Sequence, residues 1–267
     1  MVKMEENDEW SNEDSHTSRY VLDKKYNVYT IVSPKALNDF AEECLVNERP
    51  GTIGLDCEAG IYHAEREEEL KKYGLLRNSS QKVTVLQLAT CNWLCIIDVK
   101  VLFQREDMTD EKWKEFFEQL FHPETTIVGF ATNNDIRYLY ARFTFLRKML
   151  QNHRRIFCLS KLSTSIRKNK DAFKVAFDGK SFDNNGGIAG LADVILEIKM
   201  DKKYQKMDWA ARPLSVEQKY YAVKDALVPY LIQKEIFYRI QSDFEFDKAV
   251  EIMNNGHLDM SIISIYL

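Results

Sequence analysis

The chain has 267 residues, of which 45% are hydrophobic and 29% charged. This composition excludes the disordered and collagen-like classes, and the length suits one large α/β domain without a second full domain. The formal net charge of -4 excludes a protein that coats nucleic acid indiscriminately, because that mode requires excess Lys and Arg. It leaves open an enzyme that grips a few terminal nucleotides with local cations.

The first 18 residues are polar, acidic and aperiodic, which predicts a flexible tail over 1–18. No apolar run typical of a signal peptide or of a membrane span occurs along the sequence. The five cysteines are scattered, as in proteins of a reducing compartment. We therefore expect an intracellular protein without membrane contact, in either the cytoplasm or the nucleus.

The first predicted elements are a strand over NVYTIV and a helix that follows it. Ser33 is the expected N-cap of this helix, with Pro34 at its first position. Three segments rich in Val, Ile, Leu and Thr come next and predict successive strands: TIGLDCEA, KVTVLQLAT and NWLCIIDV. Strands that follow one another in this way are usually antiparallel neighbours.

From residue 110 onwards helices and strands alternate. The sequence predicts a helix over DEKWKEFFEQLF, a strand over TTIVGF, a helix over NDIRYLYARF, a short strand over RIFCLS and helical structure to the end. Three strands followed by this alternation predict an α/β domain with a mixed sheet. Residues 60–81 and 166–187 are expected to be surface insertions, as loops or short helices.

The strand TIGLDCEA presents two carboxylates on one face. Asp56 and Glu58 are two residues apart, so they point the same way while Cys57 points to the other side. No Lys or Arg lies within the strand to neutralise them. Hard divalent cations are natural partners for such a pair, although a strand end that emerges into solvent would also tolerate both acids.

Another carboxylate follows the predicted strand TTIVGF. The next helix begins near Asn133 and Asn134, with Asn134 as the expected N-cap, so Asp135 falls in the first turn. In that position Asp135 can be part of a functional site, or it can simply complement the helix dipole.

The last long helix begins at a capping box formed by Ser215 and Gln218. Tyr221 and Asp225 follow four residues apart, so a phenol and a carboxylate project from one helical face. The alternative is a core aromatic beside an exposed acid.

These segments, in this order, resemble the three motifs of the DEDD superfamily of 3′-5′ exonucleases, tyrosine subclass. That group includes RNase D, the exonuclease domain of the Werner-syndrome helicase and the Nibbler-type RNA trimmers. The matching stretches are GLDCEA with VTVLQLAT and CIIDV, then VGFATNNDIRYL, then GLADVILEIKMDKKYQKMDWAARPLSVEQKYYAVKDA. The tyrosine subclass is indicated because Tyr221 stands four residues before the last Asp, while Tyr220 occupies the position of the histidine subclass.

The resemblance implies an RNase H-like fold, with a mixed sheet of five or six strands flanked by helices. It implies an exonuclease domain over 19–245 and a C-terminal extension over 246–267. It also implies two Mg²⁺ or Mn²⁺ ions, held by Asp56, Glu58, Asp135 and Asp225, with Tyr221 orienting or helping to deprotonate the attacking water. The implied partners are a single-stranded RNA or DNA 3′ end, with RNA favoured, and proteins of RNA processing. A non-catalytic RNA-binding scaffold of the same fold is the alternative.

Substrate contacts are expected at three places. Leu88 and Asn134 adjoin the motifs and are expected to meet the terminal nucleotide, and Arg212 is expected to meet a phosphate. The insertion 166–187 carries Lys168, Lys170 and Lys174 among phenylalanines. Cations between aromatic rings suit a single strand, whereas a surface loop with packed phenylalanines and solvated lysines is the alternative.

Overall fold

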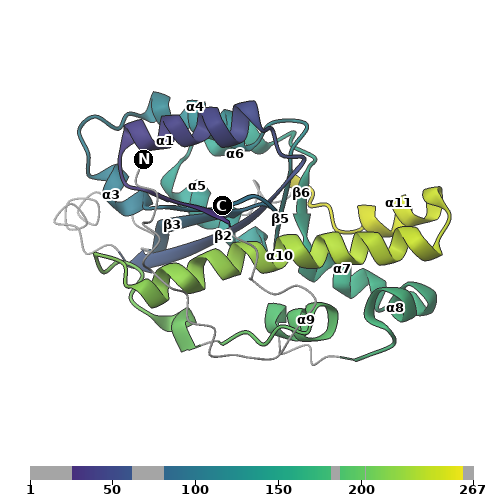
Figure 1. The fold of residues 1–267 in the computed structure, drawn as a ribbon. Helices are drawn as coiled ribbons and strands as arrows, with labels where there is room; N and C mark the ends of the chain where they lie inside the picture. Colours follow the sequence, from purple (N-terminus) through teal and green to yellow (C-terminus); the bar gives the residue numbers. More distant parts are fainter. Residues whose placement is uncertain (1–25, 62–80, 182–186, 202, 261–267) are drawn as a thin grey trace, which may run out of the picture.

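The computed structural model describes residues 26–61, 81–181, 187–201 and 203–260. Its centre is a six-stranded sheet in the order β1-β4-β3-β2-β5-β6 (Figure 1). The strands are β1 (Asn27–Ile31), β2 (Thr52–Ile61), β3 (Gln81–Ala89), β4 (Trp93–Ile97), β5 (Thr126–Gly129) and β6 (Ile156–Cys158). The predicted mixed sheet is confirmed.

The middle of the sheet is the antiparallel meander that the sequence predicted. β3 pairs with both β2 and β4 in antiparallel register. β1 joins β4 in parallel on one side, while β5 and β6 extend β2 in parallel on the other. The meander brings β2 to an inner position, so its side chains face helices on both sides of the sheet.

One face of the sheet is covered by the helices that come early in the chain. They are α1 (Pro34–Phe40), η1 (Ala41–Asn47), α3 (Val99–Phe103), α4 (Asp110–Leu120), α5 (Asn133–Arg142) and α6 (Leu146–Leu150). The Ser33 hydroxyl caps α1 by accepting a bond from the N–H of Ala36, as predicted. Aromatic rings fill the core on this face, with Trp113 and Phe117 centred 4.8 and 4.9 Å from Phe143.

The other face carries the later helices; in Figure 1, α7, α8, α9 and α10 lie below the sheet and α11 lies to its right. They are α7 (Leu159–Ile166), α8 (Lys170–Phe177), α9 (Gly187–Leu196), η3 (Lys203–Lys206), α10 (Val216–Asp243) and α11 (Phe246–Asn254). The capping box of Ser215 and Gln218 starts α10, as predicted. Among the described residues, no helix combines the length and apolarity needed to cross a membrane.

Helix α10 lies directly on β2. A Cβ added to Gly54 would come within 2.1 Å of the Ala226 carbonyl oxygen, so glycine is required for this approach. The contact sets the height of α10 above the strand, and Asp225 is the neighbour of Ala226 in sequence.

The predicted tail and insertions are described only in part. Residues 1–18 and most of 60–81 lie outside the described residues. Within 166–187, residues 170–177 form the short surface helix α8. In the predicted extension 246–267, α11 packs Ala249, Ile252 and Met253 into the core beneath the sheet.

Candidate active site

Asp56 and Glu58 lie on the face of β2 that meets α10. Cys57 points into the opposite core with Ile53 and Leu55, so the alternation read from the sequence holds in the structure. Both acids are half-buried. They come from the strand against which α10 is pressed.

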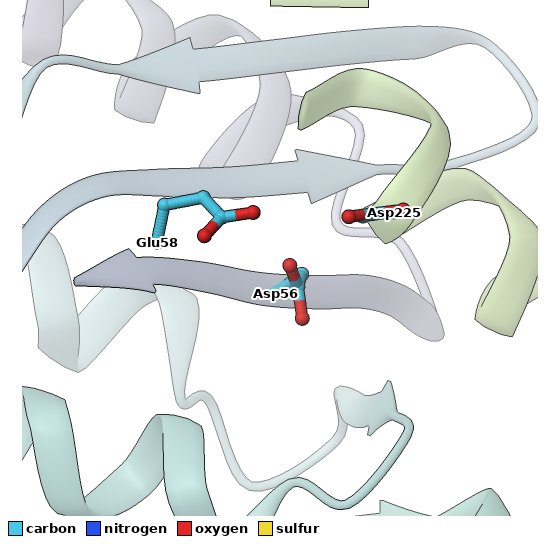
Figure 2. Close-up of side chains that lie close together, drawn as sticks. All are labelled: Asp56, Glu58 and Asp225. Carbon is cyan, nitrogen blue, oxygen red and sulfur yellow. The ribbon is translucent and has the colours of Figure 1, made fainter. Parts of the chain in front are cut away.

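Asp225 reaches the same place from α10. One carboxylate oxygen from each of Asp56, Glu58 and Asp225 lies within 4.8 Å of the others. Figure 2 shows the three side chains converging between the strand and the helix. Residues far apart in the sequence thus form one carboxylate cluster, which we define as these three residues.

Asp135 stands at the start of α5, in the first turn and only 5% exposed. It is not part of the carboxylate cluster, but its charge raises the pKa of Asp56. Burial raises the pKa of Asp135 well above its usual value, although a hydrogen bond from the backbone N–H of Cys57 opposes this. The predicted N-cap was wrong, because α5 begins at Asn133 with Thr132 as its N-cap.

Burial and mutual repulsion make the cluster hard to ionise. Burial raises the pKa of Asp56 well above its usual value, and the charges of Asp135 and Asp225 act in the same direction. Burial, reinforced by Asp225 and Asp135, raises the pKa of Glu58 to about 9. Burial also raises the pKa of Asp225 to about 7, against an opposing hydrogen bond from Tyr221. Without a cation, these groups hold protons that ordinary surface carboxylates would release.

Tyr221 stands beside the cluster on the same face of α10 as Asp225. Its phenol shares a hydrogen bond with Asp225. Burial, together with the charges of Asp225 and Glu58, raises the pKa of Tyr221 above its usual value. In the metal-free protein the phenol therefore keeps its proton and is a hydrogen-bond donor.

The residues present fit a divalent metal site. The cluster offers oxygen ligands, which Mg²⁺ and Mn²⁺ prefer. Among the described residues, neither the cluster nor Asp135 makes an ion pair with a lysine or arginine. A divalent cation would neutralise the repulsion that burial amplifies.

A 3′-5′ exonuclease family profile matches residues 68–241 of the chain, which is more than half of it. The matched region contains Asp135, Tyr221 and Asp225 and begins after β2. The chain belongs to the 3′-5′ exonuclease family.

Named relatives of this exonuclease domain are much longer proteins. Exonuclease mut-7 of Caenorhabditis elegans is 25% identical over 193 residues, which cover 70% of this chain and 20% of mut-7. The mut-7 homolog of Aedes aegypti is 28% identical over 150 residues, 55% of this chain and 20% of the homolog. The chain thus spans about a fifth of the length of these curated relatives.

The fold is that of solved RNase H-like exonucleases. The Nibbler EXO domain of Aedes aegypti superimposes with a TM-score of 0.67 at 20% identity, covering 90% of this chain and 100% of that domain. RNase D of Escherichia coli, an exoribonuclease involved in structured RNA processing, superimposes with a TM-score of 0.59 at 18% identity, covering 91% of this chain and 50% of RNase D.

The side chains of two predicted substrate contacts are engaged within the protein. Leu88 is fully buried in the core on the face of the sheet opposite the cluster, so its side chain offers no surface to a nucleotide. Alternation along β3 forces this, because the neighbouring Gln87 is paired with Asp56 and faces α10. Arg212 is held in an ion pair with Asp98 and bonds to backbone carbonyls, so its guanidinium is not directed at a phosphate.

The predicted lysines divide into two groups. Lys168 lines a groove of about 510 Å³ between α7 and the first turn of α5, which Lys161 and the predicted contact Asn134 also line. Lys170 and Lys174 are exposed on α8 and are not among the residues that line this groove.

The aromatic part of the single-strand grip is not available in α8. Phe177 is fully buried in the core, and Phe173 packs against it edge-on with ring centroids 5.5 Å apart. Phe182 lies outside the described residues. The packed-phenylalanine alternative therefore describes this helix, whose lysines remain at the surface.

Sequence reasoning missed Gln87. Its side chain is fully buried, and neither its amide nitrogen nor its amide oxygen has a hydrogen-bond partner among the described residues. It stands directly across from Asp56 in the antiparallel pair, on the same face. An amide inside the largely apolar strand VTVLQLA was the available signal, because a buried polar group normally has a partner.

Proposed function

We propose that the chain hydrolyses nucleotides from the 3′ end of single-stranded nucleic acid, with RNA preferred over DNA, in a metal-dependent reaction. The observation that carries this proposal is the meeting of Asp56, Glu58 and Asp225 within 4.8 Å, in a chain of the 3′-5′ exonuclease family. A half-buried cluster of like charges is costly unless a cation is bound. Its presence therefore supports a catalytic site over a scaffold.

The carboxylates would hold two Mg²⁺ or Mn²⁺ ions. We assign the cluster of Asp56, Glu58 and Asp225 to direct ligation, and Asp135 to the second ion. When bound, such ions activate the attacking water and stabilise the departing 3′ oxygen of the phosphodiester. The chain contributes the spacing of the ligands, because β2 and α10 hold them on two rigid elements.

Tyr221 would orient the attacking water. Its phenol is anchored by Asp225 and lies close enough to Glu58 and Asp56 for their charges to raise its pKa. The phenol donates its one O–H to Asp225, which leaves its oxygen to accept a hydrogen bond from the attacking water, so we assign Tyr221 to orienting this water or helping to deprotonate it.

The groove beside α5 supports a single-stranded substrate. Lys161 and Lys168 supply positive charge, and Asn133 and Asn134 supply amide groups, next to the turn that carries Asp135. Lysines and amides of this kind contact phosphates and sugars without reading sequence. RNA is preferred in the proposal because RNase D, which shares the fold, is an exoribonuclease.

The test is digestion of 5′-labelled single-stranded RNA, single-stranded DNA and a recessed duplex, each with Mg²⁺, with Mn²⁺ or with chelator. We expect a ladder that shortens from the 3′ end, faster on RNA than on DNA, and no products in chelator. Asp56→Asn should abolish cleavage while the protein stays folded. Activity of this variant within tenfold of the parent would rule out the assigned site, and RNA binding without cleavage by the parent would favour the scaffold.

A further inference from the structure

The Arg212 side chain is 15% exposed and makes five hydrogen bonds. Its Nε and Nη2 donate to the two carboxylate oxygens of Asp98 at 2.5 and 2.8 Å. Nη1 donates to the carbonyl oxygens of Trp209 and Ala211, and Nη2 also donates to that of Thr84. Because its N–H groups donate to these partners, the guanidinium has few donors left for a phosphate.

The bond to Thr84 connects Arg212 with Glu58. The register of β3 changes opposite Glu58 and Ala59, where Val85 and Val83 are the successive partners and Thr84 is left over as a bulge. The Thr84 hydroxyl donates to the Glu58 carbonyl oxygen at 3.0 Å, while the Thr84 carbonyl oxygen accepts from Arg212 at 3.1 Å. Arg212 therefore holds the bulge that sets the backbone at Glu58.

The bond to Trp209 connects Arg212 with Tyr221. Trp209 is buried, and its ring centroid lies 6.0 Å from that of Tyr221. Trp209 belongs to the segment 208–212, which is hydrogen-bonded to the first turn of α10, where Gln218 donates to the Asp208 carbonyl oxygen at 3.2 Å. Movement of this segment would shift the wall against which the phenol rests.

The segment 208–212 also packs closely against β2. A Cβ added to Gly60 would lie 2.9 Å from the Ala210 side chain and 3.0 Å from that of Thr84. Lys100 donates to the Ala210 carbonyl oxygen at 2.5 Å, and Asp98 caps α3 by accepting from Val101. The Arg212–Asp98 ion pair thus connects α3, the bulge of β3 and the segment 208–212 that precedes α10.

We propose that Arg212, paired with Asp98, is a positioning residue that fixes Glu58 and Tyr221 relative to each other. This inference rests on the proposed exonuclease function, because it assigns Glu58 to the metal and Tyr221 to the water. Small displacements of catalytic groups are costly in rate, and a site held by supporting hydrogen bonds keeps its geometry. A phosphate-binding Arg212 would act on substrate affinity instead.

The test uses Arg212→Lys, which keeps the charge but cannot donate to both Asp98 oxygens and to the Thr84 and Trp209 carbonyls together. Asp98→Asn is the second variant, because it keeps the volume and the cap of α3 while replacing one acceptor oxygen. Alanine is avoided at both positions, since it would leave a buried charge unpaired.

Arg239→Lys is the matched control. Arg239 is 19% exposed and bonds Glu235 and the carbonyl oxygens of Ala176 and Ile195, at the far end of α10. It therefore reports what loss of an equally engaged guanidinium does to the fold alone. All proteins are compared below their own melting temperatures.

We expect Arg212→Lys and Asp98→Asn to slow single-turnover cleavage of saturating single-stranded RNA at least tenfold and to weaken Mn²⁺ binding in calorimetry at least threefold. The RNA Kd in chelator and its salt dependence should stay within twofold of the parent, and Arg239→Lys should leave the rate within twofold. Unchanged Mn²⁺ affinity, equal slowing by Arg239→Lys, or a salt slope reduced by about one would each overturn the proposal. A parent that binds Mn²⁺ but cleaves nothing would defeat the proposed function, and the Mn²⁺ titrations of the variants would still decide the positioning role.

Discussion

Replacing Asp56 with Asn should stabilise the metal-free protein while it abolishes cleavage. Asp56 shares a space 4.8 Å across with the carboxylate oxygens of Glu58 and Asp225. Two unit charges at that separation repel by about 3 kcal/mol when the effective dielectric constant is about 20. Part of this repulsion is already relieved by protonation, because the pKa of Glu58 is raised to about 9 and that of Asp225 to about 7. We therefore expect a gain of about 1–3 kcal/mol in the free energy of unfolding near neutral pH.

The gain should grow with pH. A carboxyl group whose pKa is higher in the folded state binds more protons there than in the unfolded chain. The parent protein is thus most stable below the unfolded pKa and loses stability as pH rises through the folded pKa. For Glu58 this window runs from the ordinary pKa of 4.5 to about 9. Asp56→Asn lowers the cost of ionising Glu58, so its advantage should be small at pH 5 and largest near pH 8.5.

The assay is thermal or urea unfolding of both proteins in chelator at several pH values, and again in Mg²⁺. A gain of about 1–3 kcal/mol corresponds to a rise in Tm of roughly 3–10 °C for a chain of this size. Mg²⁺ should raise the Tm of the parent and have little effect on the variant. Asp243→Asn, at an exposed position in the last turn of α10, is the control. No gain in chelator, or a gain that does not increase with pH, would refute the reasoning.

Three further outcomes are expected. Tyr221→Phe should slow hydrolysis by roughly 10²-fold without weakening metal binding, and a parallel fall in metal affinity measured by calorimetry would show that Tyr221 acts as a ligand or a structural group. Lys168→Ala should weaken binding of single-stranded RNA and flatten its salt dependence. Lys174→Ala, outside the groove, should do neither, and equal effects of the two variants in fluorescence anisotropy would count against the groove. Gly54→Ala should lower the free energy of unfolding by about 1–3 kcal/mol and lower Mn²⁺ affinity, because it pushes α10 off β2; a variant with parental unfolding and metal titration curves would contradict the close packing.

Features that depend on a few neighbouring residues could be predicted from the sequence. Ser33 and the capping box of Ser215 begin helices through bonds to residues three positions away. Asp56 and Glu58 share a face because side chains alternate along any strand. The four-residue spacing of Tyr221 and Asp225 likewise follows from the period of a helix. These local rules predicted the mixed sheet, whereas the resemblance to the DEDD exonucleases was also needed to single out the residues proposed for the site.

Features that depend on which strand or helix lies opposite could not be predicted in this way. From the sequence, Arg212 was expected to be free to bind a phosphate. Only the fold brings it to its ion-pair partner Asp98, which is 114 positions away in the sequence. Leu88 adjoins the motif in sequence, yet its register turns it into the core. The bulge at Thr84 and the contact of Gly54 with α10 arise from pairing between distant segments. The sequence by itself singled out the groups that we propose carry the chemistry, whereas the tertiary structure decided which charges are neutralised and which remain together, because neutralisation requires contacts between distant segments.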